Sequence, residues 1–175
     1  HYRDRRQRQM CIRDRSEPAG IITFPGVNGY TAELDKRLPY DVDAAKKLLA
    51  DAGYPNGFDV ELRCPNDRYV NDEAICTAVV GMLGKIGVKV DLFAQTKSKH
   101  FKELKDNQGD FYMLGWGVPT LDSHYVFHYL YETGASWNKV NFSDAEVDAA
   151  IRVMEGEVNL DKRNAAIANA WKIVK

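Results

Sequence analysis

The segment from Gly115 to Asp122 carries the residue types best suited to hold a small ligand. Gly115 and Gly117 expose backbone donors and acceptors, while Trp116 between them offers a flat apolar face. This combination suits an extended, partly apolar ligand that is held by main-chain hydrogen bonds. Packing of Trp116 into the core is the alternative interpretation, and the residue types alone favour neither.

Two charged side chains could meet the ends of such a ligand. Arg68 can bind a carboxylate through a bidentate pair, and Asp122 can bind an amine. Each also has an ordinary role, Arg68 as a solvated loop charge and Asp122 as the cap of a helix from Ser123 to Tyr131. The predicted ligand-binding residues are Trp116, Gly117, Pro119, Thr120, Asp122, Asn66, Arg68, Tyr69, Trp137 and Asn138.

Histidines and cysteines offer two other kinds of site. His124 and His128, close to Asp122, have the i, i+4 spacing that can chelate a transition metal on a helix. Such pairs also arise by chance in aromatic helices, so we predict one packed and one solvated histidine and no metal site. Cys64 ends a predicted strand and Cys76 lies in the next predicted helix. A disulfide is within their reach, and two buried free thiols are the alternative.

Motifs typical of enzymes do not occur at the expected places. A nucleotide-binding α/β unit needs a glycine-rich turn directly after its first strand. The corresponding turn, from Cys64 to Tyr69, has no glycine, and the chain has neither a P-loop nor a G-x-S-x-G elbow. We therefore predict no catalytic residues and no cofactor.

The hydrophobic pattern predicts the elements that position these residues. Alternation of apolar and polar residues at 58–63 and 88–92 indicates half-buried strands, and the apolar run 111–116 is typical of a buried strand. Apolar residues at helical spacing, caps and terminating glycines predict helices over 41–52, 71–86, 98–107, 123–131, 143–154 and from 161 onward. Asn71 is the predicted cap of the second helix, and Ser143 and Glu146 form a predicted capping box.

Three strands thus alternate with two helices between residues 58 and 116. This βαβαβ order predicts an α/β fold with a parallel sheet. The carboxyl ends of parallel strands lie at the same edge of a sheet. We therefore expect the loops after the first and third strands to share one rim, with Trp137 and Asn138 beside them.

Length and charge exclude several other classes of protein. The chain has 175 residues and a net charge of −1, but residues 1–15 hold six Arg and two Asp. The rest has 18 Lys and Arg against 23 Asp and Glu, which argues against a nucleic-acid-binding surface. We predict that 1–15 is a disordered, non-native read-through tail, that 16–40 is a connecting segment and that 41–175 is part of a ligand-binding lobe.

Five blocks of the sequence resemble a known family, the extracytoplasmic solute-binding proteins of family 5. They are YDVDAAKKLLADAGYP at 40–55, MLGKIGVKV at 82–90, GDFYMLGWG at 109–117, FSDAEVD at 142–148 and DKR at 161–163. They come in the order and spacing of the family, and the resemblance covers roughly residues 20–175. Members of this family are the receptors of peptide, nickel and related ABC importers.

The resemblance implies a fold of two lobes that close on a solute, in the type II manner of periplasmic binding proteins. This chain resembles most of the C-terminal lobe, so it would hold an incomplete fold and half of a binding site. The implied partners are a peptide or other small solute and the permease of an ABC importer. The implied location is periplasmic or otherwise extracytoplasmic, and we expect a monomer without nucleic-acid partners.

One position departs from the pattern of the peptide-binding members. They place an Asp three residues after the tryptophan of the GW pair, where it meets the α-amino group of the peptide, and this chain has Pro119 there. Asp122 could substitute for it. A small flavodoxin-like α/β enzyme and an interaction domain are the alternative functions.

Overall fold

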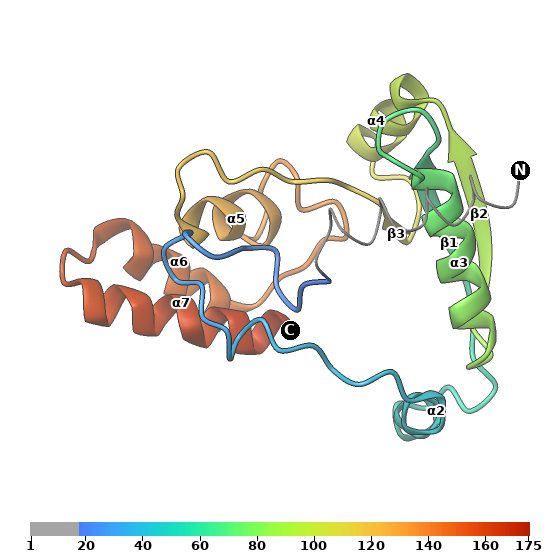
Figure 1. The fold of residues 1–175 in the computed structure, drawn as a ribbon, viewed down its shortest axis with the longest axis horizontal. Coiled ribbons are helices and arrows are strands. Elements are labelled where there is room, and N and C mark those ends of the chain that lie inside the picture. Colours follow the sequence, from blue (N-terminus) through green and yellow to red (C-terminus); the bar gives the residue numbers. More distant parts are fainter. Residues whose placement is uncertain (1–17) are drawn as a thin grey trace, which may run out of the picture. The chain divides into compact units, whose positions relative to one another are not determined.

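The computed structural model describes residues 18–175, in two compact units that interleave along the chain (Figure 1). The first unit comprises 18–38, 118–126 and 149–175, and the second comprises 39–117 and 127–148. The tail predicted at 1–15 lies outside the described residues, and the predicted domain boundaries stay predictions. Within 18–175, no helix combines the length and the apolar character needed to cross a bilayer.

The second unit contains a three-stranded parallel sheet. Its strands are β1 (Asp59–Pro65), β2 (Lys89–Gln95) and β3 (Phe111–Tyr112), in the order β2-β1-β3. β1 pairs with β2 from Asp59↔Lys89 to Pro65↔Gln95, and with β3 at Leu62↔Phe111. The connections run through α3 (Asp72–Gly84) and α4 (Lys97–Lys105). The predicted α/β fold with a parallel sheet is confirmed.

The core of this unit lies between the sheet and α3. Leu62, Cys64 and Cys76 are its buried members. The partly buried side chains packed against them are Val79, Val80, Val90, Leu92, Phe111 and Met113. Full burial of an aliphatic side chain such as Leu62 contributes about 1.5–3 kcal/mol, so this cluster stabilises the packing of α3 on the sheet.

β1 departs from the predicted alternation because its polar residue Arg63 is also buried, with 9% of its surface exposed. The guanidinium of Arg63 donates to Glu103 at 3.1 Å and to Glu61 at 2.6 Å. It also lies over the ring of Phe93, 3.9 Å from the centroid. A buried charge is tolerated when carboxylates and hydrogen bonds surround it, and this site supplies both.

The third strand is shorter than predicted. The apolar run 111–116 was expected to be one strand, but β3 ends at Tyr112. Met113 still donates its N–H to the carbonyl of Arg63 at 2.9 Å, and beyond it the chain leaves the sheet. The apolar residues that follow are therefore available for a site at the end of the sheet.

Two predicted helix caps are replaced by their neighbours. Asn71 precedes α3 with a left-handed φ of 57°, and its side chain makes no capping hydrogen bond. Asp144, rather than Ser143, caps α6 (Ala145–Gly156) by accepting from the N–H groups of Glu146 and Val147. At α6 the carboxylate of Asp144 accepts from two first-turn N–H groups, whereas at α3 Asp72 accepts from Glu73 and from two amides of the preceding loop.

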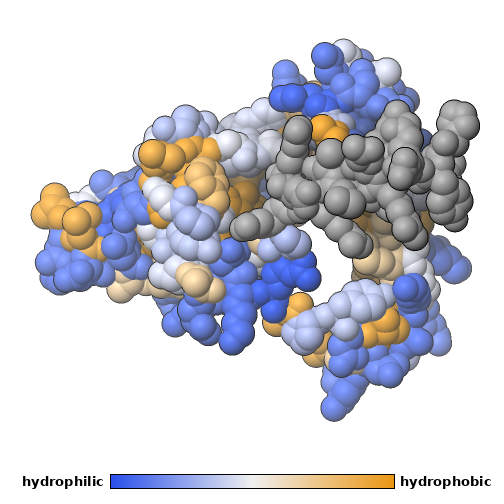
Figure 2. All heavy atoms as spheres, viewed as in Figure 1, coloured by the Kyte–Doolittle hydropathy of each residue, from blue (hydrophilic) through white to orange (hydrophobic). Residues whose placement is uncertain are grey.

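α2 (Val42–Asp51) begins at the predicted cap, Asp41, whose carboxylate accepts from Asp43 and Ala44. It buries none of its residues, and 69% of Leu48 is exposed. Figure 2 shows the apolar surface that gathers over this helix. Its formation therefore rests on its cap and on the helix-favouring Ala, Lys and Leu residues rather than on burial.

The first unit is built on α7 (Leu160–Val174) and the end of α6. Its buried side chains include Ile151 and Met154 on α6, and Ile167, Ala170 and Trp171 on α7. The segment 18–38 adds three buried apolar side chains, Ile21, Val27 and Leu34. α5 (Ser123–Leu130) begins in this unit, and its residues are shared between the two units.

Candidate functional site

Two stretches meet at the carboxyl ends of β1 and β3. The post-β1 loop comprises residues 66–71, and the post-β3 segment comprises residues 113–117. The N–H of Gly115 donates to the hydroxyl oxygen of Tyr69 at 2.9 Å. A Cβ on Gly115 would lie 2.7 Å from Cε1 of Tyr69, so only glycine permits this approach. The structure thus brings together the two loops that were predicted to share a rim.

Asp72 shapes the post-β1 loop from the start of α3. Its carboxylate accepts from the N–H groups of Arg68 at 2.9 Å, Tyr69 at 3.0 Å and Glu73 at 2.9 Å. The hydrogen bond from Tyr69, followed by those from Arg68 and Glu73, holds the pKa of Asp72 below its ordinary value. Only 4% of Asp72 is exposed. The sequence indicated this role of Asp72 only weakly, through the presence of an acid in the first turn of a predicted helix.

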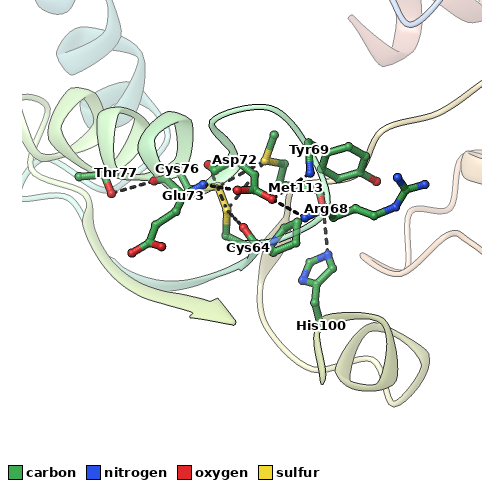
Figure 3. Close-up of a disulfide and its surroundings, with 10 residues drawn as sticks. Cys64, Arg68, Tyr69, Asp72, Glu73, Cys76, Thr77, His100 and Met113 are labelled. Atoms are coloured by element: carbon green, nitrogen blue, oxygen red, sulfur yellow. Dashed lines mark hydrogen bonds between the residues drawn. A yellow bond between two sulfur atoms is a disulfide. The ribbon is translucent and has the colours of Figure 1, made fainter. Parts of the chain in front are cut away.

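A disulfide fixes the other side of this loop (Figure 3). Cys64 and Cys76 are joined, with their Cα atoms 6.5 Å apart, and both are buried. The bond joins the end of β1 to α3. It is the disulfide that the sequence left open beside two free thiols. Sδ of Met113 lies 3.8 Å from Sγ of Cys64 and 3.6 Å from Sγ of Cys76. The disulfide therefore also supports the first residue of the post-β3 segment.

Trp116 packs within a group of aromatic rings in the second unit. Its centroid lies 6.0 Å from that of Tyr129 and 5.9 Å from that of Trp137, and Trp137 lies 6.3 Å from Phe101. Trp116 is half-buried. The two interpretations left open by the sequence are thus compatible, because one face of the ring can pack while another meets a ligand.

The other predicted ligand-binding residues of the second unit differ in exposure and in hydrogen bonding. Asn66 and Arg68 are exposed, and the guanidinium of Arg68 lies 5.0 Å from the centroid of the Tyr69 ring. Gly117 is exposed, and no described atom lies within 4 Å of the place of a Cβ. Asn138 is 7% exposed, and its amide group bonds to the backbone of Glu132 and Phe142. Asn138 thus closes a turn.

Asp122, in the first unit, is engaged by a bidentate ion pair. Its Oδ2 and Oδ1 lie 2.7 and 2.9 Å from Nη1 and Nη2 of Arg163. It also accepts from the side chain of Asn28 at 3.0 Å and from the N–H of His124 at 2.8 Å. Burial alone would raise the pKa of Asp122, but the hydrogen bonds from Arg163, His124 and Asn28 hold it below its ordinary value. The bond from His124 is the helix cap that the sequence allowed.

Pro119 and Thr120 occupy an exposed turn just before Asp122. The N–H of Leu121 donates to the carbonyl of Val118 at 3.1 Å, and Val118 is buried. Leu121 has a left-handed φ of 51° and leaves 55% of its surface exposed. The turn therefore presents mainly apolar side chains to the outside.

The histidines of α5 are each paired with a carboxylate in their own unit. Nε2 of His124 lies 3.5 Å from Glu155, and Nδ1 of His128 lies 2.8 Å from Glu132. Their side chains are 28% and 42% exposed, so the predicted contrast between a packed and a solvated histidine is not found. A third histidine, His100, is completely buried, which the local pattern did not indicate.

Comparison with known proteins agrees with the α/β fold and with the loops at its strand ends. Residues 9–138 match the model of bacterial extracellular solute-binding proteins, family 5 Middle. Heme-binding protein A of Haemophilus influenzae is 27% identical over 158 residues, which cover 86% of this chain and 28% of that protein. The dipeptide-binding protein of Escherichia coli is 28% identical over 122 residues, which cover 68% of this chain and 23% of that protein.

Among solved structures, the PBP AgaA from A. tumefaciens R10, in complex with agropinic acid, superposes with a TM-score of 0.80 at 25% identity. The match covers 91% of this chain and 33% of that one. The chain thus spans about a quarter to a third of the length of these relatives. The family match begins at residue 9, inside the predicted tail, whose assignment stays a prediction.

A parallel α/β sheet with loops gathered at the carboxyl ends of its strands is the architecture of a ligand-binding lobe. The family match covers most of the described residues. The chain belongs to the bacterial extracellular solute-binding proteins of family 5.

Proposed function

We propose that this chain forms part of the C-terminal lobe of a two-lobed receptor that captures a peptide or similar small solute. The junction between Gly115 and Tyr69 is the observation that carries the proposal, because it joins the two strand-end loops beside Trp116. Family membership and the names of the dipeptide-binding and heme-binding relatives support it. The receptor then delivers its solute to the permease of an ABC importer.

Within this lobe, Trp116 packs against an apolar part of the solute, and the backbone of Gly117 bonds to its main chain. Arg68 binds a carboxylate of the solute, since its side chain is exposed on the same loop as Tyr69. Pro119 and Thr120, in an exposed turn of the first unit, stay predicted contact residues. Asp122 acts indirectly, because its carboxylate is taken by Arg163 and by the cap of α5.

The receptor works outside the cytoplasm as a monomer, and it binds its solute without catalysis. Two features support a binding role. The turn after β1 has no glycine-rich cradle for a nucleotide phosphate. The residues at the strand ends are aromatic, amide and backbone groups that suit recognition. These features do not favour the alternative of a flavodoxin-like enzyme.

The test is to recover the complete reading frame that encodes this chain and to purify its product. Native mass spectrometry with the dipeptide Leu-Leu, glutathione and heme then shows whether it holds a solute. We expect a second lobe in the reading frame and a one-to-one complex with one of these probes. A reading frame that ends near Lys175 and encodes no second lobe would contradict the proposal, as would a two-lobed product that binds none of the probes.

A further inference from the structure

His100 is the one buried histidine among residues 18–175, and none of its surface is exposed. It lies in the first turn of α4, a helix whose lysines are all exposed. A histidine in such a place gives up hydration of its charged form, so its retention needs a physical reason. Its ring contacts supply one.

The ring of His100 points at the start of the post-β3 segment (Figure 3). Nε2 lies 3.1 Å from the carbonyl oxygen of Met113. A carbonyl oxygen can only accept, so Nε2 carries the hydrogen and donates it. Nδ1 is buried and has no hydrogen-bond partner among the described residues. With Nδ1 unprotonated, this arrangement fits the neutral Nε2–H tautomer.

Met113 is therefore held at both of its backbone groups. Its N–H donates to β1 at Arg63, and its carbonyl accepts from His100. Two residues further on, Gly115 donates to Tyr69, and Trp116 follows. The contact with His100 thus lies where the chain turns from the sheet into the segment that carries Trp116.

Protonation of His100 would leave Nε2–H as a donor to Met113 but would make the ring unfavourable in its buried place. It would place a second hydrogen on Nδ1, where the described residues offer no acceptor, and a charge in a buried space. Burial accordingly lowers the pKa of His100. The hydrogen bond to Met113 and the carboxylates of Glu103 on α4 and Asp72 on α3 act in the opposite direction and do not cancel it. Both carboxylates are already engaged, Glu103 by Arg63 and Gln95, and Asp72 by loop amides.

We propose that His100 is a positioning residue for solute binding: the neutral ring holds the post-β3 segment in place through Met113, and a charge on the ring disturbs the segment because the buried Nδ1–H then has no acceptor among the described residues. The contact between His100 and the post-β3 segment does not depend on the proposed function. Only the statement that this segment contacts a solute rests on that function. The hold is complete above pH 6.5, the ordinary value for histidine, and it weakens as the pH falls below that value.

The experiment follows the ¹⁵N–¹H resonances of Met113, Gly115, Trp116 and Gly117 in the solute-free chain from pH 8 to pH 5. In the wild type we expect these resonances to move together, with a midpoint below 6.5. His100→Gln keeps an N–H donor but cannot titrate, so its resonances should stay at their pH 8 positions throughout. His100→Phe has no donor and should show displaced resonances even at pH 8. His128→Gln, which removes a partly exposed histidine, should titrate like the wild type.

A second measurement keeps the test decisive if the variants fail to fold. Long-range ¹H–¹⁵N spectra of the wild-type rings report the tautomer of His100 directly, and we expect Nε2–H at pH 8. A charged ring or an Nδ1–H tautomer at pH 8 would overturn the proposal. So would segment resonances that stay in place while the ring of His100 becomes charged, or that move equally in His100→Gln. No solute enters the experiment, so its failure is separate from a failure of the proposed function.

Discussion

Asp72 and Asp122 are two carboxylates that organise backbone groups, each within its own unit. Asp72 gathers the amides of the post-β1 loop, and Asp122 joins Arg163 to the start of α5. The resemblance to peptide-binding members made Asp122 a candidate for meeting a solute amine. In this structure its oxygens already accept from Arg163, Asn28 and His124. A charged residue near a predicted site can thus have its hydrogen-bonding capacity taken largely by partners from distant parts of the sequence.

Replacement of Asp122 by Ala should destabilise the chain. The variant leaves Arg163 partly buried without its partner and removes a helix cap, which together cost on the order of 2–3 kcal/mol. Urea unfolding at pH 7 measures the change, with the exposed Glu33→Ala as the control. The pKa of Asp122 is lowered in the folded state, so its contribution is complete above the ordinary value of 3.8 and is lost as the pH falls below it. A loss of unfolding free energy in Asp122→Ala no larger than that in Glu33→Ala at pH 7 would contradict this prediction.

Gly115 and Gly117 provide a matched pair for the contact with Tyr69. Gly115→Ala puts a methyl group 2.7 Å from the Tyr69 ring, whereas Gly117→Ala meets no described atom within 4 Å. We expect Gly115→Ala to lower the free energy of unfolding by about 1–3 kcal/mol through overpacking. Gly117→Ala should change it by less than about 0.5 kcal/mol, as surface substitutions usually do. Thermal unfolding compares the two, and equal effects would show that the Tyr69 contact is not formed.

At the scale of the element, local pattern predicted the sheet and most helices. Val60, Leu62 and Val90 alternate with polar residues, and Asp41 caps α2 as expected. The failures depend on contacts between distant residues. β3 ends early, and the N–H of Gly115 then bonds to a side chain 46 residues away. No periodicity in a short window contains such information, because tertiary partners decide where a strand stops.

The candidate site was predictable only in part, as the fold was. The rule for strand ends in parallel sheets brought the loops of Tyr69 and Trp116 together correctly. Asp72 and His100 were not found, because their roles depend on burial and on backbone partners in other segments. Arg63 is likewise buried only because Glu61 and Glu103 flank it.

The disulfide links two elements, and its removal tests how strongly β1 and α3 depend on each other. Cys64 and Cys76 are 12 residues apart, and a loop of this size stabilises the folded state by roughly 3 kcal/mol. We expect the double variant Cys64→Ala/Cys76→Ala to lose about that amount in urea unfolding. Cys11→Ala, at the third cysteine, is the control. Intact mass should rise by two hydrogens on reduction of the wild type, and an unchanged mass would reject the bridge.

At the scale of the whole molecule, the chain belongs to a family of solute-binding proteins and spans about a quarter to a third of the relatives compared with it. Its second unit supplies a parallel sheet, a disulfide and two joined loops. The helix α2 leaves its apolar residues exposed. The sheet and the disulfide hold the start of the post-β1 loop and the end of β3 in place.

The most direct test of the binding site is calorimetry on the product of the complete reading frame, with the probe that the wild type binds. Trp116→Ala removes the aromatic face proposed to contact the solute. We expect affinity to fall by about 5- to 150-fold, the equivalent of 1–3 kcal/mol, with unfolding still cooperative. Phe24→Ala removes an aromatic side chain that is 49% exposed outside the proposed site, and it should leave affinity unchanged. An unchanged affinity in Trp116→Ala would contradict the placement of the solute beside the post-β3 segment.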